Sequence, residues 1–125
     1  MIYEKSYTVA LSDLDAFGRL KPSALLYYAQ EAAGDHAALL GTGWDALQEQ
    51  GLFWAVIRTR AEIFGQPRCG EQMTVKTWPL PTTRTAYPRC VMGYNSEGSL
   101  LFKVLSLWVL MDVKSRAMVL PGKAA

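Results

Sequence analysis

The spacing of apolar residues changes partway along the chain, and the change predicts the order of its secondary structure. Over residues 23–40 apolar positions recur every three or four residues, which is the period of an amphipathic helix. Pro22 suits the first turn of that helix, where a missing N–H costs nothing, and Gly41 is a typical stop. A short second helix is predicted over residues 44–50, closed by Gly51.

Elsewhere the apolar residues follow the two-residue period of β-strands. Strands are predicted over residues 2–10, 52–64, 73–78, 84–94 and 100–112, with a short closing strand at 118–120. In the second of these, Phe53 and Ile57 alternate with Arg58, so we expect Phe53 and Ile57 on its buried face. Pro88 must lie at an edge or a bulge of its strand. Segment 100–112 is apolar on both faces, which is typical of a central, covered strand.

These elements give the order β–α–α–β–β–β–β, with one long, Ala-rich helix followed by a run of antiparallel strands. This is an α+β pattern, expected when a curved antiparallel sheet wraps one central helix, the hot-dog architecture. No internal repeat or low-complexity linker interrupts it, and 125 residues are enough for one core but not two. We therefore expect a single hot-dog domain over residues 1–125.

Charge is distributed unevenly and narrows the choice of partner. Residues 1–55 hold three basic and seven acidic groups, whereas residues 56–125 hold ten and four, giving a net charge of +2 for the chain. A domain that binds nucleic acid is usually far more basic, so no nucleic-acid partner is expected. The basic second part instead favours an acidic protein or an anionic small molecule as the partner.

Missing motifs exclude several kinds of chemistry. His36, Cys69 and Cys90 are the only His and Cys residues, too few for a usual zinc site, and the dithiol, dinucleotide, P-loop and nucleophile-elbow motifs do not occur. We expect neither metal nor cofactor. Reduced cysteines and a start without a secretory pattern predict a cytoplasmic protein. The longest apolar run, residues 104–111, is too short to cross a membrane.

Several segments together resemble acyl-ACP thioesterases. Residues 13–23 and 30–36 are similar to the loop and central helix of that family, residues 51–60 and 67–78 to its next two strands, and residues 106–112 to its last long strand. The resemblance covers one hot-dog unit and is greatest to the first, N-terminal unit of two-unit members. It implies a hydrolase of fatty acyl-ACP or acyl-CoA in fatty acid biosynthesis, acting as a homodimer with the acyl group bound between units. Whether such dimers pair into a tetramer is left open.

Asp15 is the first candidate for the chemistry of thioester hydrolysis. It lies in the D-x-D-x-x-G loop that ends at Gly18, where hot-dog thioesterases with such a loop place their carboxylate. The resemblance implies that Asp15 acts as general base or nucleophile, while backbone N–H groups near Gly18 and the helix start polarise the carbonyl. The alternative is that Asp13 and Asp15 only form Asx turns and caps.

Phe17 and Arg19 depart from the family pattern. The catalytic unit of two-unit members resembles D-x-N-x-H, and alignment on Asp15 puts Phe17 in place of Asn and Arg19 in place of His. Phe cannot orient water, and Arg cannot act as a base at neutral pH. A carboxylate-only mechanism remains open. So does a second function, a non-catalytic protein that binds acyl groups or acyl carriers.

Other candidates are weaker. Glu31, on the predicted helix, is a second candidate carboxylate, but it lies about 200° around the helix from Ala29, away from the apolar stripe, which favours a solvated acid or an ion pair. Aromatic and basic side chains are candidates for substrate binding as well as for ordinary core or surface positions. The candidate substrate-binding residues are Phe17, Arg19, Phe53, Trp54, Arg58 and Arg60. Arg89 belongs to a wider group of basic strand residues that could receive a phosphate or an acidic carrier protein.

Overall fold

The structure, a computed structural model, describes residues 1–121. Its elements are β1 (Tyr3–Thr8), a short 3₁₀ helix η1 (Leu11–Asp13), α1 (Pro22–Leu39), α2 (Trp44–Glu49), β2 (Leu52–Ile63), β3 (Gln72–Pro79), β4 (Tyr87–Tyr94), β5 (Leu100–Asp112) and β6 (Met118–Val119). The predicted order of helices and strands is confirmed. Within residues 1–121 no helix is long and apolar enough to span a membrane.

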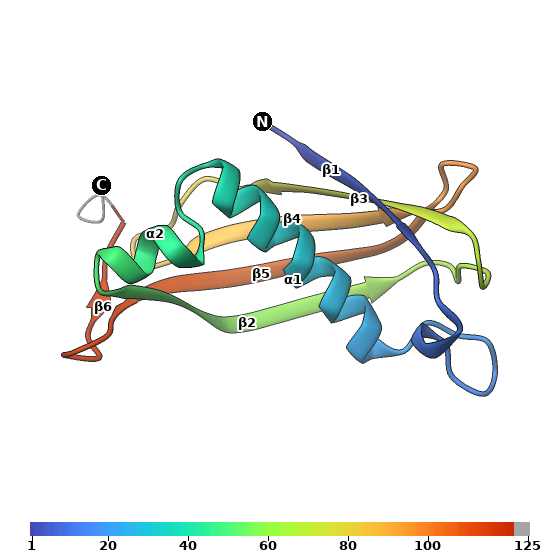
Figure 1. Cartoon of the computed structure of the whole chain (residues 1–125), viewed down its shortest axis with the longest axis horizontal. Helices are drawn as coiled ribbons and strands as arrows, with labels where there is room; N and C mark the ends of the chain where they lie inside the picture. The colour runs from blue at the N-terminus through green and yellow to red at the C-terminus, as the bar shows by residue number, and fades with distance from the viewer. Residues whose placement is uncertain (122–125) are drawn as a thin grey trace.

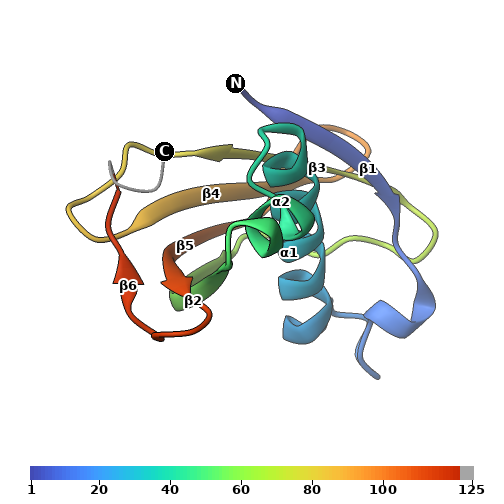
Figure 2. The same ribbon diagram turned by 60° about the vertical axis from the view of Figure 1, so that its left-hand side comes forward.

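All strands belong to one antiparallel sheet, ordered β1-β3-β4-β5-β2, with β6 paired to β5. Helix α1 lies across one face of this sheet, and the sheet curves around it (Figures 1 and 2). The α+β hot-dog architecture expected from the sequence is therefore confirmed. β5 is a central strand, as its two apolar faces predicted, and β1 and β2 form the edges.

The main core lies between α1 and the strands that α1 crosses. Ala29 and Ala32 on α1 are buried against Val75 of β3 and Val104 of β5. Because alanine side chains are short, the helix can approach the sheet closely along its middle. A smaller cluster, built on Leu47, lies where α2 packs near β2. The space between α1, α2 and the sheet near this second cluster is incompletely filled, and it forms the groove described below.

A bulge in β2 overturns the predicted face of that strand. The pairing of β2 with β5 shifts between Val56 and Arg58, so two residues of β2 oppose one residue of β5 there. The extra residue reverses which side chains face α1, and Ile57 is 58% exposed instead of buried. On the helix-facing side, Trp54 and Val56 precede the bulge and Thr59 follows it.

The strand predicted over residues 84–94 begins three residues later than expected. Thr83 accepts a hydrogen bond from the N–H of Ala86 at its hydroxyl and donates its own N–H to the Ala86 carbonyl, so these residues form a turn. Pro88 comes one residue before Arg89, which forms the last pair of β4 with β3, opposite Pro79. The carbonyl of Pro88 accepts the N–H of Leu80. The predicted edge or bulge is therefore wrong, because β4 lies inside the sheet and Pro88 pairs with Leu107 of β5 without a register shift. The proline is tolerated because it lies where the pairing of β4 with β3 ends.

Candidate functional site

Two adjoining cavities form a groove between the helices and the sheet. The larger has a volume of about 680 Å³ and lies by the second half of α1, the start of α2 and the ends of β2, β4 and β5. The smaller, about 180 Å³, lies by the middle of α1 and the centres of β2, β4 and β5. Four residues line both: Gln30, Ala33, Arg89 and Trp108. A mostly apolar groove of this size with a few polar groups is typical of a small-molecule site.

Aromatic side chains form one wall of the larger cavity. Trp54 of β2 contacts Tyr87 edge-on, with ring centroids 5.0 Å apart, and Trp108 in the same manner at 6.4 Å. The indole N–H of Trp54 donates to the carbonyl of Thr42 at 3.0 Å. This bond fixes the ring against the loop that joins the two helices, so the wall is preformed rather than assembled by a ligand.

A row of polar side chains crosses the sheet beneath the groove. Thr59 of β2 pairs with Ser106 of β5, and Ser106 pairs with Arg89 of β4. All three line the smaller cavity. Nη1 of Arg89 donates to Nδ1 of His36 at 2.9 Å and to Oγ1 of Thr77 at 3.1 Å. The half-buried guanidinium is thus held in place by two neutral acceptors.

His36 is a neutral, buried residue of α1. Its side chain is 0% exposed, and burial, together with the adjacent Arg89 charge, lowers its pKa. Since Nδ1 accepts from Arg89, the proton of the neutral ring resides on Nε2, which has no partner within residues 1–121. The ring stacks on Tyr3 with centroids 5.6 Å apart. His36 therefore orients Arg89 as a neutral acceptor and carries no charge near neutral pH.

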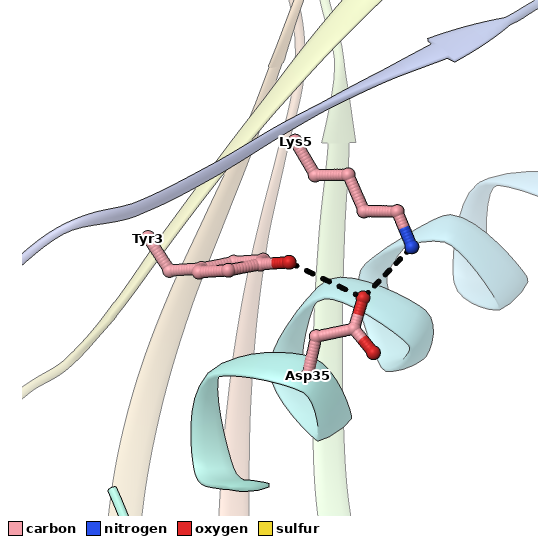
Figure 3. Close-up of polar contacts among 3 residues, drawn as sticks. All are labelled: Tyr3, Lys5 and Asp35. Atoms are coloured by element: carbon pink, nitrogen blue, oxygen red, sulfur yellow. Dashed lines mark hydrogen bonds and ion pairs between the residues drawn. The ribbon is translucent and has the colours of Figure 1, made fainter. Parts of the chain in front are cut away.

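A polar cluster connects strand β1 to helix α1 (Figure 3). Oδ2 of Asp35 accepts from Nζ of Lys5 at 2.9 Å and from the hydroxyl of Tyr3 at 3.4 Å. Glu31 lies one turn before Asp35, and its charge adds to the burial that raises the pKa of Tyr7 on β1 to about 12. Glu31 therefore lies on the β1 side of α1, away from the groove lined by Gln30 and Ala33.

The loop that contains Asp15 is held by Asp15 itself. Its Oδ1 accepts the backbone N–H groups of Phe17 at 2.8 Å and Arg19 at 3.0 Å. These bonds hold the pKa of the Asp15 carboxyl below its ordinary value, so it is ionised at neutral pH. The N–H of Gly18 donates to the Asp15 carbonyl at 3.0 Å. Asp15 is exposed and, within the described chain, does not line either cavity.

The other predicted site residues are scattered. Phe17 is 83% exposed at the loop tip, with the Arg19 guanidinium 5.7 Å from its ring centroid. Arg58 and Arg60 are exposed on β2. Of the predicted substrate-binding residues, only Trp54 lines the groove; its neighbour Phe53 does not.

Sequence reasoning did not single out Gln30, Ser106 or the place of Arg89. Strand register is the signal that could have found the last two, because residues directly opposite on paired strands share a face. The bulge in β2 hides that register from a simple alternation pattern.

The fold agrees with what comparison with known proteins shows. The sequence profile of the family described as "Acyl-ACP thioesterase N-terminal domain" matches residues 1–120, so the chain belongs to this family. The chain is 20% identical over 123 residues to a chloroplastic palmitoyl-acyl carrier protein thioesterase of Cuphea hookeriana. That match covers 93% of this chain but 30% of the relative, so the chain spans less than a third of that protein.

Solved thioesterases share the fold. An acyl-ACP thioesterase from Bacteroides thetaiotaomicron superposes with a TM-score of 0.90 at 24% identity, covering 98% of this chain and 50% of the other. A 1,4-dihydroxy-2-naphthoyl-CoA thioesterase from Synechocystis superposes with a TM-score of 0.85 at 15% identity, covering 97% and 90%. The first match corresponds to half of a longer chain and the second to nearly a whole one. Both support the hot-dog fold.

Proposed function

We propose that this chain binds the acyl part of an acyl thioester in the groove between α1 and the sheet, and hydrolyses it to a free acid and a thiol. The observation that carries this proposal is the groove itself, two adjoining cavities of about 680 and 180 Å³ in a chain of the acyl-ACP thioesterase family. Fatty acyl-ACP and acyl-CoA are the proposed substrates. A cytoplasmic location and a role in fatty acid biosynthesis are part of the same proposal.

Asp15 is the proposed general base. Its Oδ1 is occupied by two loop N–H groups, which leaves Oδ2 of an ionised carboxylate to accept a proton from water. The water oxygen bonds to the thioester carbon, and collapse of the resulting oxyanion breaks the C–S bond. The departing sulfur then takes the proton back from Asp15. As a nucleophile, Asp15 would instead form an acyl anhydride that water cleaves. Glu31 remains the second candidate, on the other side of α1.

Backbone N–H groups at the start of α1 are the proposed donors to the oxyanion. The N–H groups of Ser23 and Ala24 have no acceptor within residues 1–121, as expected in the first turn of a helix. The N–H of Gly18, predicted for this role, donates to Asp15 in this structure, so its use requires that bond to open. The free first-turn donors therefore suit the role better.

A second hot-dog unit is proposed to complete the site, in the form of a second copy of this chain. β2 pairs only with β5 among the described strands, so its other edge presents unpaired backbone groups along Leu52–Ile63. Exposed Val56 and Ile57 lie on this strand, and Val56 borders the smaller cavity together with Leu26 of α1. A copy paired along β2 in a two-fold arrangement would cover that opening and extend the sheet.

A non-catalytic acyl-binding protein is the second candidate function. Phe17 and Arg19 favour it, because they stand where the family's catalytic unit has Asn and His. Such a protein would bind acyl groups in the same groove and release no thiol.

Free-thiol release from a panel of acyl-ACP and acyl-CoA thioesters distinguishes the two functions. Asp15→Asn keeps the Oδ1 acceptor of the loop but removes the charge, so the fold stays intact and turnover should fall by about 10²–10⁴-fold. Asp112→Asn is the matched control, since Oδ1 of Asp112 likewise accepts two backbone N–H groups in a turn. Unchanged turnover in Asp15→Asn would remove Asp15 from the mechanism. Tight binding without thiol release would favour the second function.

A further inference from the structure

The polar row in the groove is bordered on both sides by largely apolar rows. One neighbouring row contains Ala61, Val104 and Val91, and the other contains Val56, Trp108 and Tyr87. Between them lie Thr59, Ser106 and Arg89, and Gln30 of α1 lines the same small cavity. A hydrocarbon chain alone offers no hydrogen-bond partner to the guanidinium of Arg89, which lines both cavities. Burying polar groups without partners is unfavourable, so a purely apolar ligand does not explain this residue.

Arg89 has no opposite charge near it. Within residues 1–121 the ion pairs join Lys5 to Asp35 and Arg60 to Glu62, and neither involves Arg89. Burial lowers the pKa of the guanidinium, yet an arginine stays charged in proteins. The groove therefore contains a half-buried positive charge that no carboxylate of the described residues neutralises, and that an anionic ligand would compensate.

The free part of the guanidinium has a defined shape. Nη1 donates to His36 and Thr77, whereas Nε and Nη2 have no acceptor among the described residues. The N–H bonds of Nε and Nη2 lie side by side on one edge of the plane, and this edge binds a carboxylate through two parallel hydrogen bonds. The two neutral acceptors fix the orientation of the guanidinium, so the edge is preorganised.

We propose that Arg89 is a specificity residue that recognises a carboxylate carried by the acyl group, so that the preferred substrates are thioesters of dicarboxylic acids. The hydroxyl of Ser106, directly opposite Arg89 on β5, and the amide of Gln30 line the same cavity and are available to the carboxylate oxygens. This inference rests on the proposed function, because it assumes that the groove holds the acyl part of a thioester.

Three series of CoA thioesters of equal chain length test the inference. One series ends in a methyl group and a second in a carboxylate, and a third, ending in a hydroxyl, separates charge from hydrogen bonding. We expect at least one chain length at which the carboxylate raises kcat/KM by about tenfold or more, mainly through KM. Arg89→Gln should abolish this preference while keeping a polar side chain beside Thr77. Arg89→Lys, which keeps the charge but not the fork, should retain only part of it.

Arg116→Gln is the matched control, since it removes the same charge from an exposed turn far along the chain and should leave the preference intact. Equal or better hydrolysis of the methyl series at every length would overturn the inference and leave the proposed function standing. Absence of thiol release from all series would instead overturn the proposed function. In that case, or if Arg89→Gln does not fold, binding of non-hydrolysable thioether analogues to the wild-type chain decides. Stronger binding of the carboxylate analogue supports the inference, and equal binding contradicts it.

Discussion

Nη1 of Arg89 lies 2.9 Å from Nδ1 of His36, and this contact connects the interior strand β4 to the central helix α1. It requires a neutral imidazole, because a doubly protonated ring has no lone pair to accept a bond. The buried polar pair therefore links three properties of the molecule: the orientation of the guanidinium in the groove, the protonation of the histidine, and the packing of α1 on the sheet.

Protonation of His36 should destabilise the fold in mildly acidic solution. In the unfolded chain its pKa is near the ordinary 6.5, and in the folded chain the pKa is lower. The unfolded state therefore binds a proton first, so the free energy of unfolding falls as the pH drops below about 6.5 and continues to fall until the folded pKa is passed. Above that range His36 contributes no pH dependence.

Urea unfolding at pH values of about 7.5 and 5.5 measures this effect. His36 is the only histidine, so no other side chain with an ordinary pKa titrates there. His36→Gln offers Arg89 a non-titrating acceptor and should lose clearly less stability than the wild type between the two conditions. An equal loss in both proteins would show that His36 is not held neutral.

Gly93→Ala should destabilise the protein by about 1–3 kcal/mol, because it adds a methyl group to a filled core. Gly93 of β4 pairs with Phe102 of β5, and an added Cβ would collide with the Phe102 ring. Gly34→Ala is the control, since its Cβ would have no atom within 4 Å, and in a helix it should stabilise by roughly 0.5–1 kcal/mol. Thermal or urea unfolding of both variants measures the free energy of unfolding, which should fall in Gly93→Ala and rise in Gly34→Ala. A neutral Gly93→Ala would mean that the ring moves aside freely.

Ile57→Lys should weaken the proposed dimer by about tenfold or more and lower thiol release with it. Ile57 is 58% exposed at the bulge of edge strand β2, where a lysine opposes pairing with another strand. Ile2→Lys, at a position 62% exposed but ahead of β1, should leave association unchanged. Sedimentation velocity over a concentration series provides the measurement. A wild-type chain that is monomeric throughout would contradict the dimer.

Ala33→Leu should shift the preferred acyl chain to shorter lengths. Ala33 lines both cavities, so a larger side chain there narrows the passage between them. Each methylene excluded from the groove forgoes about 0.8 kcal/mol of binding, so kcat/KM should fall most for the longest substrates. Ala117→Leu, in an exposed turn, is the control. Circular dichroism confirms the fold of each variant, and an unchanged length profile would place the acyl chain elsewhere.

Periodicity is sufficient to predict the elements and their order, because the helical spacing over residues 23–40 changes to the two-residue period of strands after Gly51, and turn residues separate the later segments. It failed at Ile57, where one extra residue in β2 reverses the faces of the strand, since a bulge leaves no mark in a hydrophobic pattern. The D-x-D-x-x-G motif predicts the loop of Asp15 but not the role of its carboxylate. Turn formation and base catalysis both require an aspartate at this position, so the motif does not distinguish them.

Residue type alone could not separate Arg89 from the other basic residues of the second part of the chain. Its interior position depends on the register of β4 against β5 and on a neutral acceptor from α1, and both arise only in the folded molecule. Glu31 illustrates the converse, because one helical step separates it from Gln30, which lines the groove. A step of 100° turns neighbours onto different faces of a helix, and helical spacing alone puts Glu31 about 200° from Ala29, away from the buried face of α1.

Contact between a bound acyl chain and the groove is the most direct measure of the proposed function. Intermolecular NOEs can be recorded between the acyl methylene protons of a non-hydrolysable acyl-CoA thioether and the full-length protein. The account predicts NOEs to the methyl group of Ala33 and to the indole protons of Trp54 and Trp108, which line the groove. If the analogue at saturating concentration gives NOEs only to residues outside the groove, or gives none at all, the result would contradict the proposed acyl site.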